Sequence, residues 1–219
     1  MRSLSERIEF FKNSDLYPVV SSEFCHGRNA CDIVAGIAAG GAKIVQIREK
    51  NLFDSAMYEL VKKCKAITDQ YQMLLIVDDR IDIAMATGAD GVHLGQDDFP
   101  LKEAKKLAPD LLIGISTHNS TEIQNAMKYN CSYLNIGPIF PTNTKSVPCG
   151  ALGLEKAEEL SKIVSCPFSV MGGIKEHHLK LLSSKGFRHI AMVTEITQAP
   201  DVEKQVRQLR KIMKEQCND

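Results

Sequence analysis

The chain has 219 residues, of which 44% are hydrophobic and 25% are charged, as in an ordinary soluble globular protein. Its 27 basic residues equal its 27 acidic ones, so it lacks the basic excess typical of nucleic-acid-binding or membrane-surface proteins. The seven cysteines include no Cys-x-x-Cys pair, which argues against a zinc site or a disulfide framework. No apolar run approaches the roughly 18 residues of a membrane span, and the first residues lack the apolar core of a signal peptide. We therefore expect a cytoplasmic protein.

Short runs of β-branched residues alternate with amphipathic stretches along the whole chain, a pattern that favours parallel β-α-β units. In chain order the predicted elements are a helix at 3–13, a strand at 16–20, a helix at 30–40, a strand at 43–48, a helix at 53–70, a strand at 73–77, a helix at 80–87, a strand at 91–94, a helix at 101–107, a strand at 111–115, a helix at 120–129, a strand at 133–136, a helix at 154–164, a strand at 168–171, a helix at 175–184, a strand at 189–193 and a helix at 202–215.

Eight strand–helix pairs after a short leading helix predict an α/β fold of the (β/α)8 TIM-barrel type, formed by residues 1–219 as a single domain. In such barrels the active site lies on the loops that follow the strands. The main alternative, a doubly wound open sheet, usually has a glycine-rich turn after its first strand. Here Val20 is followed by SSEFCHGRN, which does not fit that pattern.

Cationic side chains lie at the end of the second predicted strand. Because side chains alternate along a strand, Gln46, Arg48 and Lys50 share one side, and Ile47 and Glu49 share the other. Arg can bind phosphate bidentately, and Lys adds a point charge, so this set is suited to a polyphosphate. The alternative is a solvated cluster of charges.

Carboxylates follow the next two strands, in Asp78-Asp79-Arg80 and Gln96-Asp97-Asp98. Mg²⁺ is usually held by one or two carboxylates together with substrate phosphate oxygens. Aspartate at a strand–helix turn is also a common helix N-cap, so Asp79 or Asp98 alone fits either role. Their pairing with the nearby cations favours Mg²⁺.

Further anion-binding candidates follow the later strands. Ser116 could donate to an oxyanion, and His118 is either an acid or base or a polar loop residue. Thr142, Thr144 and Lys145 lie on a loop stiffened by two prolines, which suggests a pre-organised anion site, although a simple surface loop is the alternative.

Two adjacent glycines, Gly172 and Gly173, follow the seventh strand, and Val193-Thr194 follows the eighth, where barrels often bind phosphate through backbone N–H groups. The pattern thus indicates one anion site with a metal and one without. An enzyme that joins two phosphorylated small molecules would need both.

At this point the sequence resembles the thiamine phosphate synthase family. The resemblance covers about residues 15–200 and rests on segments that occur in the family's order: Gln46-Ile47-Arg48-Glu49-Lys50, Asp78-Asp79-Arg80, residues 91–98, residues 137–145 and Gly172-Gly173-Ile174.

The resemblance implies a (β/α)8 barrel that joins hydroxymethylpyrimidine diphosphate to a hydroxyethylthiazole phosphate, often carboxylated, and releases diphosphate by a dissociative mechanism. It implies that Gln46, Arg48, Lys50, Ser116 and Lys145 bind the diphosphate, with Arg48, Lys50, Ser116 and Lys145 acting in catalysis. Asp79 and Asp98 would bind Mg²⁺, and Asp78 would belong to the substrate-binding set. The thiazole phosphate would contact Thr142, Thr144, Gly173, Val193 and Thr194.

Two residues depart from the family pattern. Asp78 stands where the family usually has Asn, and Glu195 where a small residue is usual; if Glu195 pointed at the thiazole phosphate it would repel it.

The alternative functions are a thiazole tautomerase of the same superfamily, which uses a histidine near His118, another phosphate-binding barrel, and a non-catalytic binding protein. An aldolase would need a Schiff-base lysine inside the barrel, and Lys43 lies at the wrong end of its strand. The sequence leaves open the oligomeric state, including a homo-oligomer, and the role of Cys149.

Overall fold

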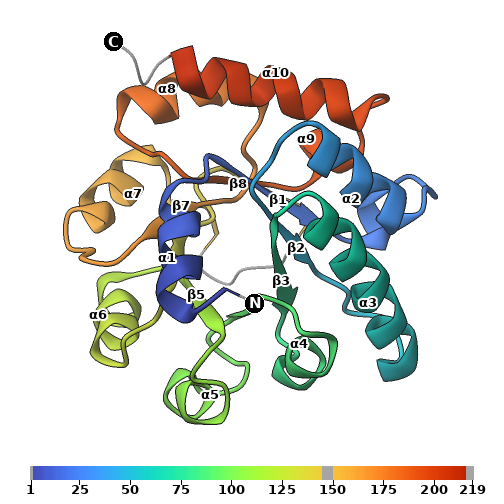
Figure 1. Ribbon diagram of the computed structural model, residues 1–219. Coiled ribbons are helices and arrows are strands. Elements are labelled where there is room, and N and C mark those ends of the chain that lie inside the picture. Colours follow the sequence, from blue (N-terminus) through green and yellow to red (C-terminus); the bar gives the residue numbers. More distant parts are fainter. Residues whose placement is uncertain (1, 145–149, 216–219) are drawn as a thin grey trace.

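The computed structural model describes residues 2–144 and 150–215. Its eight parallel strands close into a barrel in sequential order, from β1 beside β2 to β8 beside β1, and helices surround them (Figure 1). The predicted TIM barrel is confirmed. The strands are β1 (Leu16–Val20), β2 (Ile44–Ile47), β3 (Leu74–Asp78), β4 (Gly91–Leu94), β5 (Leu112–Thr117), β6 (Tyr133–Ile136), β7 (Phe168–Val170) and β8 (Ile190–Met192).

The helices follow the strands as the alternating pattern predicts. They are α1 (Leu4–Lys12), α2 (Ala30–Ala39), α3 (Asp54–Gln70), α4 (Ile81–Thr87), α5 (Leu101–Leu107), α6 (Ser120–Lys128), α7 (Leu154–Ser161), α8 (Leu179–Ser184), α9 (Thr194–Thr197) and α10 (Val202–Glu215), with short 3-10 turns η1 (Ser22–Phe24) and η2 (Glu176–His178). None of the helices in the described part of the chain is long and apolar enough to cross a membrane.

Side-chain alternation divides the core into two layers. On β2, Val45 and Ile47 pack outward in the large cluster between sheet and helices, whereas Ile44 packs inside the barrel. The inner cluster also contains Tyr17 of β1, Tyr133 of β6, and residues of β3, β5, β8 and α1. The inside of this barrel is thus a packed core, as the fold requires.

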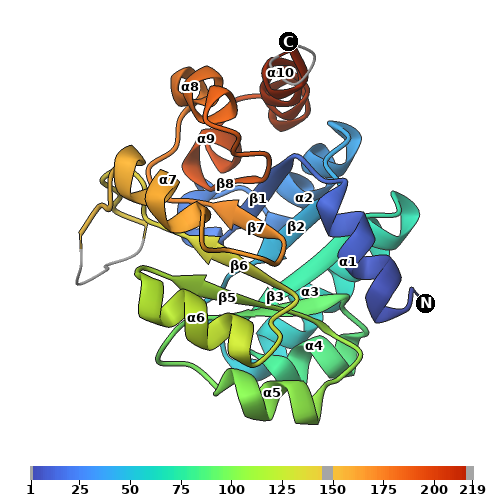
Figure 2. The same cartoon turned by 90° about the vertical axis from the view of Figure 1, so that its left-hand side faces the viewer.

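The leading helix α1 closes one end of the barrel (Figures 1 and 2). Ser3 begins it with a capping box in which the Ser3 side chain and Glu6 satisfy each other's backbone N–H groups. Phe11 is fully buried, and its ring stacks on that of Tyr133 at a centroid distance of 4.4 Å. The substrate site must therefore lie at the opposite, carboxyl end of the strands.

Several predicted boundaries near the site were wrong, among them the end of β3, which extends to Asp78. The helix predicted at 175–184 is divided into η2 and α8, because the Nδ1 atom of His178 accepts the backbone N–H of Lys175 and tightens the first turn. The strand predicted at 189–193 ends at Met192, and a short unpredicted helix, α9, begins at Thr194. β5 continues to Thr117, so Ser116 lies within the strand rather than after it.

Candidate active site

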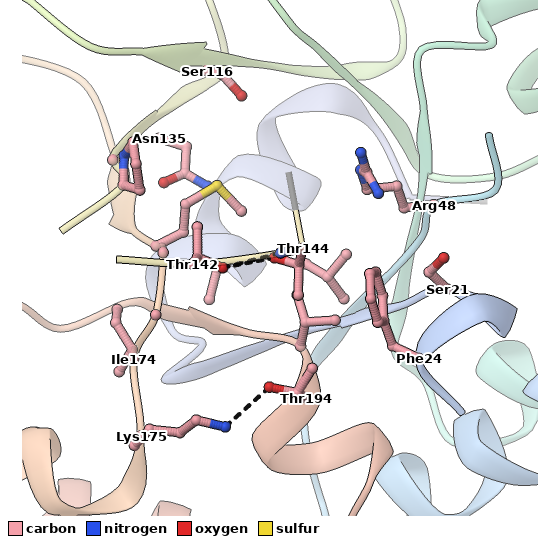
Figure 3. A pocket seen from close by; sticks show the side chains of 18 of the residues that line it. Ser21, Phe24, Arg48, Ser116, Asn135, Thr142, Thr144, Ile174, Lys175 and Thr194 are labelled. Atoms are coloured by element: carbon pink, nitrogen blue, oxygen red, sulfur yellow. Dashed lines mark hydrogen bonds between the residues drawn. The ribbon is translucent and has the colours of Figure 1, made fainter. Parts of the chain in front are cut away.

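A pocket opens at the carboxyl end of the barrel (Figure 3). It receives side chains or backbone from seven of the residues that the sequence predicted for the site: Arg48, Ser116, Thr142, Thr144, Gly173, Val193 and Thr194. These residues come from loops or strand ends after β2, β5, β6, β7 and β8. The closed barrel brings together residues whose separation in the sequence is up to about two thirds of the chain length.

The cations after β2 pair with the carboxylates after β3, the neighbouring strand. The Nε atom of Arg48 lies 3.5 Å from Oδ2 of Asp78, and the Nζ atom of Lys50 lies 3.1 Å from the same oxygen. Lys50 also forms an ion pair with Asp79. Burial lowers the pKa of Lys50, but Asp78 and Asp79 outweigh it, so the pKa is raised and the ammonium stays charged. The predicted cluster is a network of ion pairs between the buried Asp78 and more exposed side chains, rather than a set of separately solvated charges.

Asp79 and Asp98 lie close together and neither caps a helix. The backbone of Asp79 is left-handed, with φ of +58°, a conformation that aspartate tolerates better than most residues. Burial, the charge of Asp78 and a side-chain hydrogen bond with Asp98 raise the pKa of Asp79 to about 6. The carboxylate of Asp98 accepts the backbone N–H of Gly95 at 2.6 Å. Both α4 and α5 begin without a side-chain cap, which removes the capping interpretation of these two carboxylates.

A divalent cation fits this carboxylate pair. The raised pKa of Asp79, next to the charge of Asp78 and the carboxyl of Asp98, reflects the cost of holding negative charge here, and a bound cation would lower that cost. Within residues 2–144 and 150–215 no group of three or more His, Cys, Asp or Glu side chains gathers around one point. The two carboxylates of Asp79 and Asp98 suit Mg²⁺, which takes one or two carboxylates and completes its shell with water and phosphate oxygens.

A chain of hydrogen bonds crosses the barrel interior and ends at the pocket. Gln46 donates to the hydroxyl of Tyr17 at 3.1 Å, and that hydroxyl lies 2.8 Å from the hydroxyl of Tyr133. The Tyr133 hydroxyl lies 3.0 Å from Nδ1 of His93, whose Nε2 lies 2.9 Å from Oγ of Ser116. All five side chains are buried. Gln46 therefore lies beneath the pocket and supports its floor; its predicted contact with diphosphate stays a prediction.

One polarity satisfies every link of this chain. The amide of Gln46 donates to Tyr17, so the proton of Tyr17 points to Tyr133 and that of Tyr133 points to Nδ1 of His93. The neutral imidazole then carries its proton on Nε2 and donates to Ser116. In this polarity the hydroxyl proton of Ser116 is left to donate into the pocket, and its predicted hydrogen bond to an oxyanion stays a prediction.

Two further polar groups line the pocket near Ser116. Asn135 is 2% exposed, and in the part of the chain that the structure describes its Oδ1 atom has no hydrogen-bond partner. A buried acceptor without a partner is costly, so this oxygen is suited to an N–H donor on a ligand. His118 also lines the pocket, and its Nδ1 lies 2.8 Å from a carboxylate oxygen of Glu122.

The opposite side of the pocket is formed by the loops after β6, β7 and β8. The hydroxyls of Thr142 and Thr144 lie 3.0 Å apart (Figure 3). Gly173 has φ of +63°, and a Cβ there would lie 2.3 Å from the carbonyl oxygen of Pro141. Glycine is thus required because the loop after β6 passes directly over this backbone.

Lys175 is a pocket residue that sequence reasoning assigned only to a helix. Its ammonium donates to Oγ1 of Thr194 at 3.0 Å (Figure 3). The same ammonium lies 3.3 Å from Oε2 of Glu195, whose other oxygen accepts the backbone N–H of Glu176. Glu195 does not itself line the pocket, but its carboxylate lies against the ammonium of Lys175, which does.

Sequence reasoning also missed His93, Tyr17, Tyr133 and Asn135. The available signal was strand alternation, which places all four polar side chains on the inner face of their strands. Lys145 and Cys149 lie outside the described residues, so their predicted and open roles stay as the sequence left them.

Comparison with known proteins identifies the family of this chain. A family model described as thiamine monophosphate synthase matches residues 16–196. The chain belongs to the thiamine monophosphate synthase family. A thiamine-phosphate synthase of Pelotomaculum thermopropionicum is 40% identical over 97% of this chain and 96% of its own length. That of Caldicellulosiruptor saccharolyticus is 36% identical over 97% of both chains.

Solved structures give the same answer for the fold. A thiamine phosphate pyrophosphorylase from Pyrococcus furiosus superposes with a TM-score of 0.86 at 33% identity, over 94% of this chain and 98% of that one. A 3-hexulose-6-phosphate synthase superposes with a TM-score of 0.66 at 16% identity, over 91% of this chain and 99% of that one, which shows a shared barrel and no more.

Proposed function

We propose that this chain joins hydroxymethylpyrimidine diphosphate to hydroxyethylthiazole phosphate, forming thiamine phosphate and diphosphate. The observation that carries the proposal is the distribution of charge in the pocket. Arg48 and Lys175 lie on opposite sides of it (Figure 3), and none of its described lining residues is Asp or Glu. A pocket with a cation at each side and no carboxylate in its lining suits two phosphorylated substrates held together.

We place the diphosphate on the side of β2 to β5. Arg48 and Lys50 would bind it electrostatically, Ser116 would donate a hydrogen bond, and Lys145 would add a further charge. The carboxylate of Asp78 pairs with both of these cations, so the diphosphate would have to compete with it for them. The amino group of the pyrimidine is the N–H donor that the buried Oδ1 of Asn135 lacks. Thr142, Thr144, Gly173, Val193 and Thr194 would bind the thiazole phosphate.

The residues present suit a dissociative reaction. The bond between the pyrimidine methylene carbon and the diphosphate oxygen breaks, and its electron pair leaves with diphosphate. The thiazole nitrogen then donates its lone pair to the methylene cation. No protein nucleophile is needed, so the enzyme's task is to stabilise negative charge on the departing diphosphate and to hold the thiazole in line. Asp79 and Asp98 would hold Mg²⁺, which supplies Lewis-acid neutralisation of the diphosphate.

An assay with both substrates tests the proposal. The purified chain with Mg²⁺ should produce thiamine phosphate and diphosphate in equal amounts, measured by chromatography and by a diphosphate-specific coupled assay. Arg48→Ala should lower kcat/KM by about 10²–10³, the typical effect of one pre-organised electrostatic contact, and Asp79→Ala should abolish turnover. Replacement of the exposed Arg188 by Ala, just before the amino-terminal end of β8, provides the control and should leave turnover unchanged.

The tautomerase alternative gives a different result in the same assay. His118 lines the pocket beside Glu122 and could move a proton on a thiazole without metal. Isomerisation of a thiazole phosphate in the presence of a chelator, without diphosphate release when both substrates and Mg²⁺ are supplied, would favour it.

A further inference from the structure

We propose that Lys175 binds the phosphate of the thiazole substrate, and that it also neutralises Glu195, which would otherwise repel that phosphate. This inference rests on the proposed function and assigns a residue that neither the sequence motifs nor the family resemblance pointed to. Lys175 follows the Gly172-Gly173-Ile174 segment directly and lines the pocket beside Thr194.

The first argument is position. The ammonium of Lys175 is hydrogen bonded to Oγ1 of Thr194 at 3.0 Å, and Thr194 is itself placed at the thiazole phosphate by the family resemblance. A phosphate that contacts Thr194 therefore lies within reach of the Lys175 ammonium. Among the described residues that line the pocket, Lys175 is the only lysine. The one arginine among them, Arg48, lies across the pocket (Figure 3).

The second argument is charge. Glu195 is only 20% exposed, its carboxylate lies 3.3 Å from the Lys175 ammonium, and its residue directly follows Thr194. Without Lys175, a partly buried negative charge would stand next to the proposed phosphate site, where like charges repel. The ion pair removes that repulsion. The ammonium keeps a further N–H for a ligand, because it has three donors and the structure shows two in use.

The third argument is that the Lys175 side chain has room to move. The Lys175 side chain is 41% exposed, so the ammonium can shift from Thr194 to an incoming phosphate without moving backbone. A partly exposed charge is screened by water, which limits what it contributes. We therefore expect loss of Lys175 to weaken phosphate binding by about tenfold, at the lower end of the range for charge-assisted hydrogen bonds.

The test compares three variants: Lys175→Met, Lys175→Met combined with Glu195→Ala, and Lys180→Ala as a control at an exposed lysine of α8. Lys175→Met should raise KM for the thiazole phosphate about tenfold, with KM for the pyrimidine diphosphate unchanged. Adding Glu195→Ala should restore only part of that loss, because it removes the uncompensated carboxylate but does not replace the phosphate contact. Complete restoration would show that Lys175 only neutralises Glu195 and would overturn the phosphate contact.

A second measurement uses hydroxyethylthiazole, which lacks the phosphate. The preference for the phosphorylated over the unphosphorylated thiazole, as a ratio of kcat/KM values, should fall about tenfold in Lys175→Met and recover only in part in the double variant. An unchanged ratio overturns the inference. So does a loss confined to the carboxylated thiazole, since that would place Lys175 at the carboxylate instead.

Calorimetric titration of the thiazole phosphate alone separates this inference from the proposed function. Weaker binding to Lys175→Met than to the unaltered chain supports the role of Lys175, whether or not the two substrates are coupled. Absence of diphosphate release by the unaltered chain would instead count against the proposed function. Equal binding by both proteins would overturn the role of Lys175.

Discussion

The Nε2 atom of His93 lies 2.9 Å from the hydroxyl oxygen of Ser116, at the point where the buried hydrogen-bond chain meets the pocket. In the polarity assigned above, His93 donates to Ser116, which leaves the serine hydroxyl oriented to donate to a ligand. We predict that Ser116→Ala lowers the single-turnover rate of coupling by about 10²-fold, as for other donors to a developing negative charge. KM for the thiazole phosphate should stay constant. Ser184→Ala, at an exposed serine of α8, is the control, and a rate equal to that of the unaltered chain would exclude this role.

The two buried tyrosines allow the polarity of the chain to be tested. Tyr17→Phe and Tyr133→Phe each remove one buried hydroxyl, and each should lower the free energy of unfolding by about 1–3 kcal/mol, measured in urea. The two should differ in activity. Tyr133 contacts His93 directly, so its loss leaves Nδ1 without its donor and frees the imidazole to change tautomer. We expect kcat to fall several-fold more in Tyr133→Phe than in Tyr17→Phe; equal kcat values would contradict the proposed polarity.

Asp78 competes with the substrate for two cations. Its carboxylate pairs with Arg48 and Lys50, and the family pattern at this position is Asn. We predict that Asp78→Asn lowers KM for the pyrimidine diphosphate by about twofold to fivefold, the range expected for release of one ion pair near a protein surface. Initial rates at saturating thiazole phosphate measure this effect. A raised KM would show instead that Asp78 orients the cations more than it competes for them.

His189 gives the fold a dependence on pH. Burial lowers its pKa, and Arg188 lowers it too, while its bond to the carbonyl of Ser14 at 2.7 Å and the charge of Asp15 oppose this. The unfolded chain therefore takes up a proton more readily than the folded one. Stability from this residue is complete above the ordinary histidine pKa of about 6.5 and is lost as pH falls below it.

We accordingly predict that the thermal unfolding midpoint falls between pH 7.5 and 5.5, and that His189→Gln reduces this difference. Glutamine can still donate to the Ser14 carbonyl but does not titrate. His26→Asn, at an exposed histidine whose backbone is left-handed, is the control and should leave the pH dependence intact. An unaltered slope in His189→Gln would assign the effect to other groups.

Much of the architecture was predictable because it depends on local patterns. The short apolar run at 73–77 and the amphipathic stretch at 53–70 identify their elements without tertiary information. Eight such pairs leave few alternatives to a closed barrel, and the barrel in turn brings Arg48 and Thr194 to one pocket. The boundaries that failed were set by non-local or side-chain contacts, as where His178 bonds back to the backbone of Lys175.

Site residues could be predicted where a polar side chain directly follows a strand, but not where it is buried within a strand. Arg48, Asp79 and Thr142 were recognisable as polar residues just past a strand. His93 and Asn135 lie inside strands, and their importance depends on partners in distant segments, such as Tyr133 beside His93. Lys175 was missed for a related reason: its partners Thr194 and Glu195 are nearly twenty residues away, on the far side of α8.

The stacking of Phe11 on Tyr133 has a practical consequence for anyone who handles this protein. The ring that receives Phe11 carries the hydroxyl that meets His93, so the first helix supports the chemistry from the far end of the molecule. A deletion of the first dozen residues, or an affinity tag that displaces α1, would disturb the hydrogen-bond chain that ends at Ser116, although α1 contacts no substrate. Activity measured on such a shortened or tagged preparation would then underestimate the native enzyme even when the barrel itself had folded.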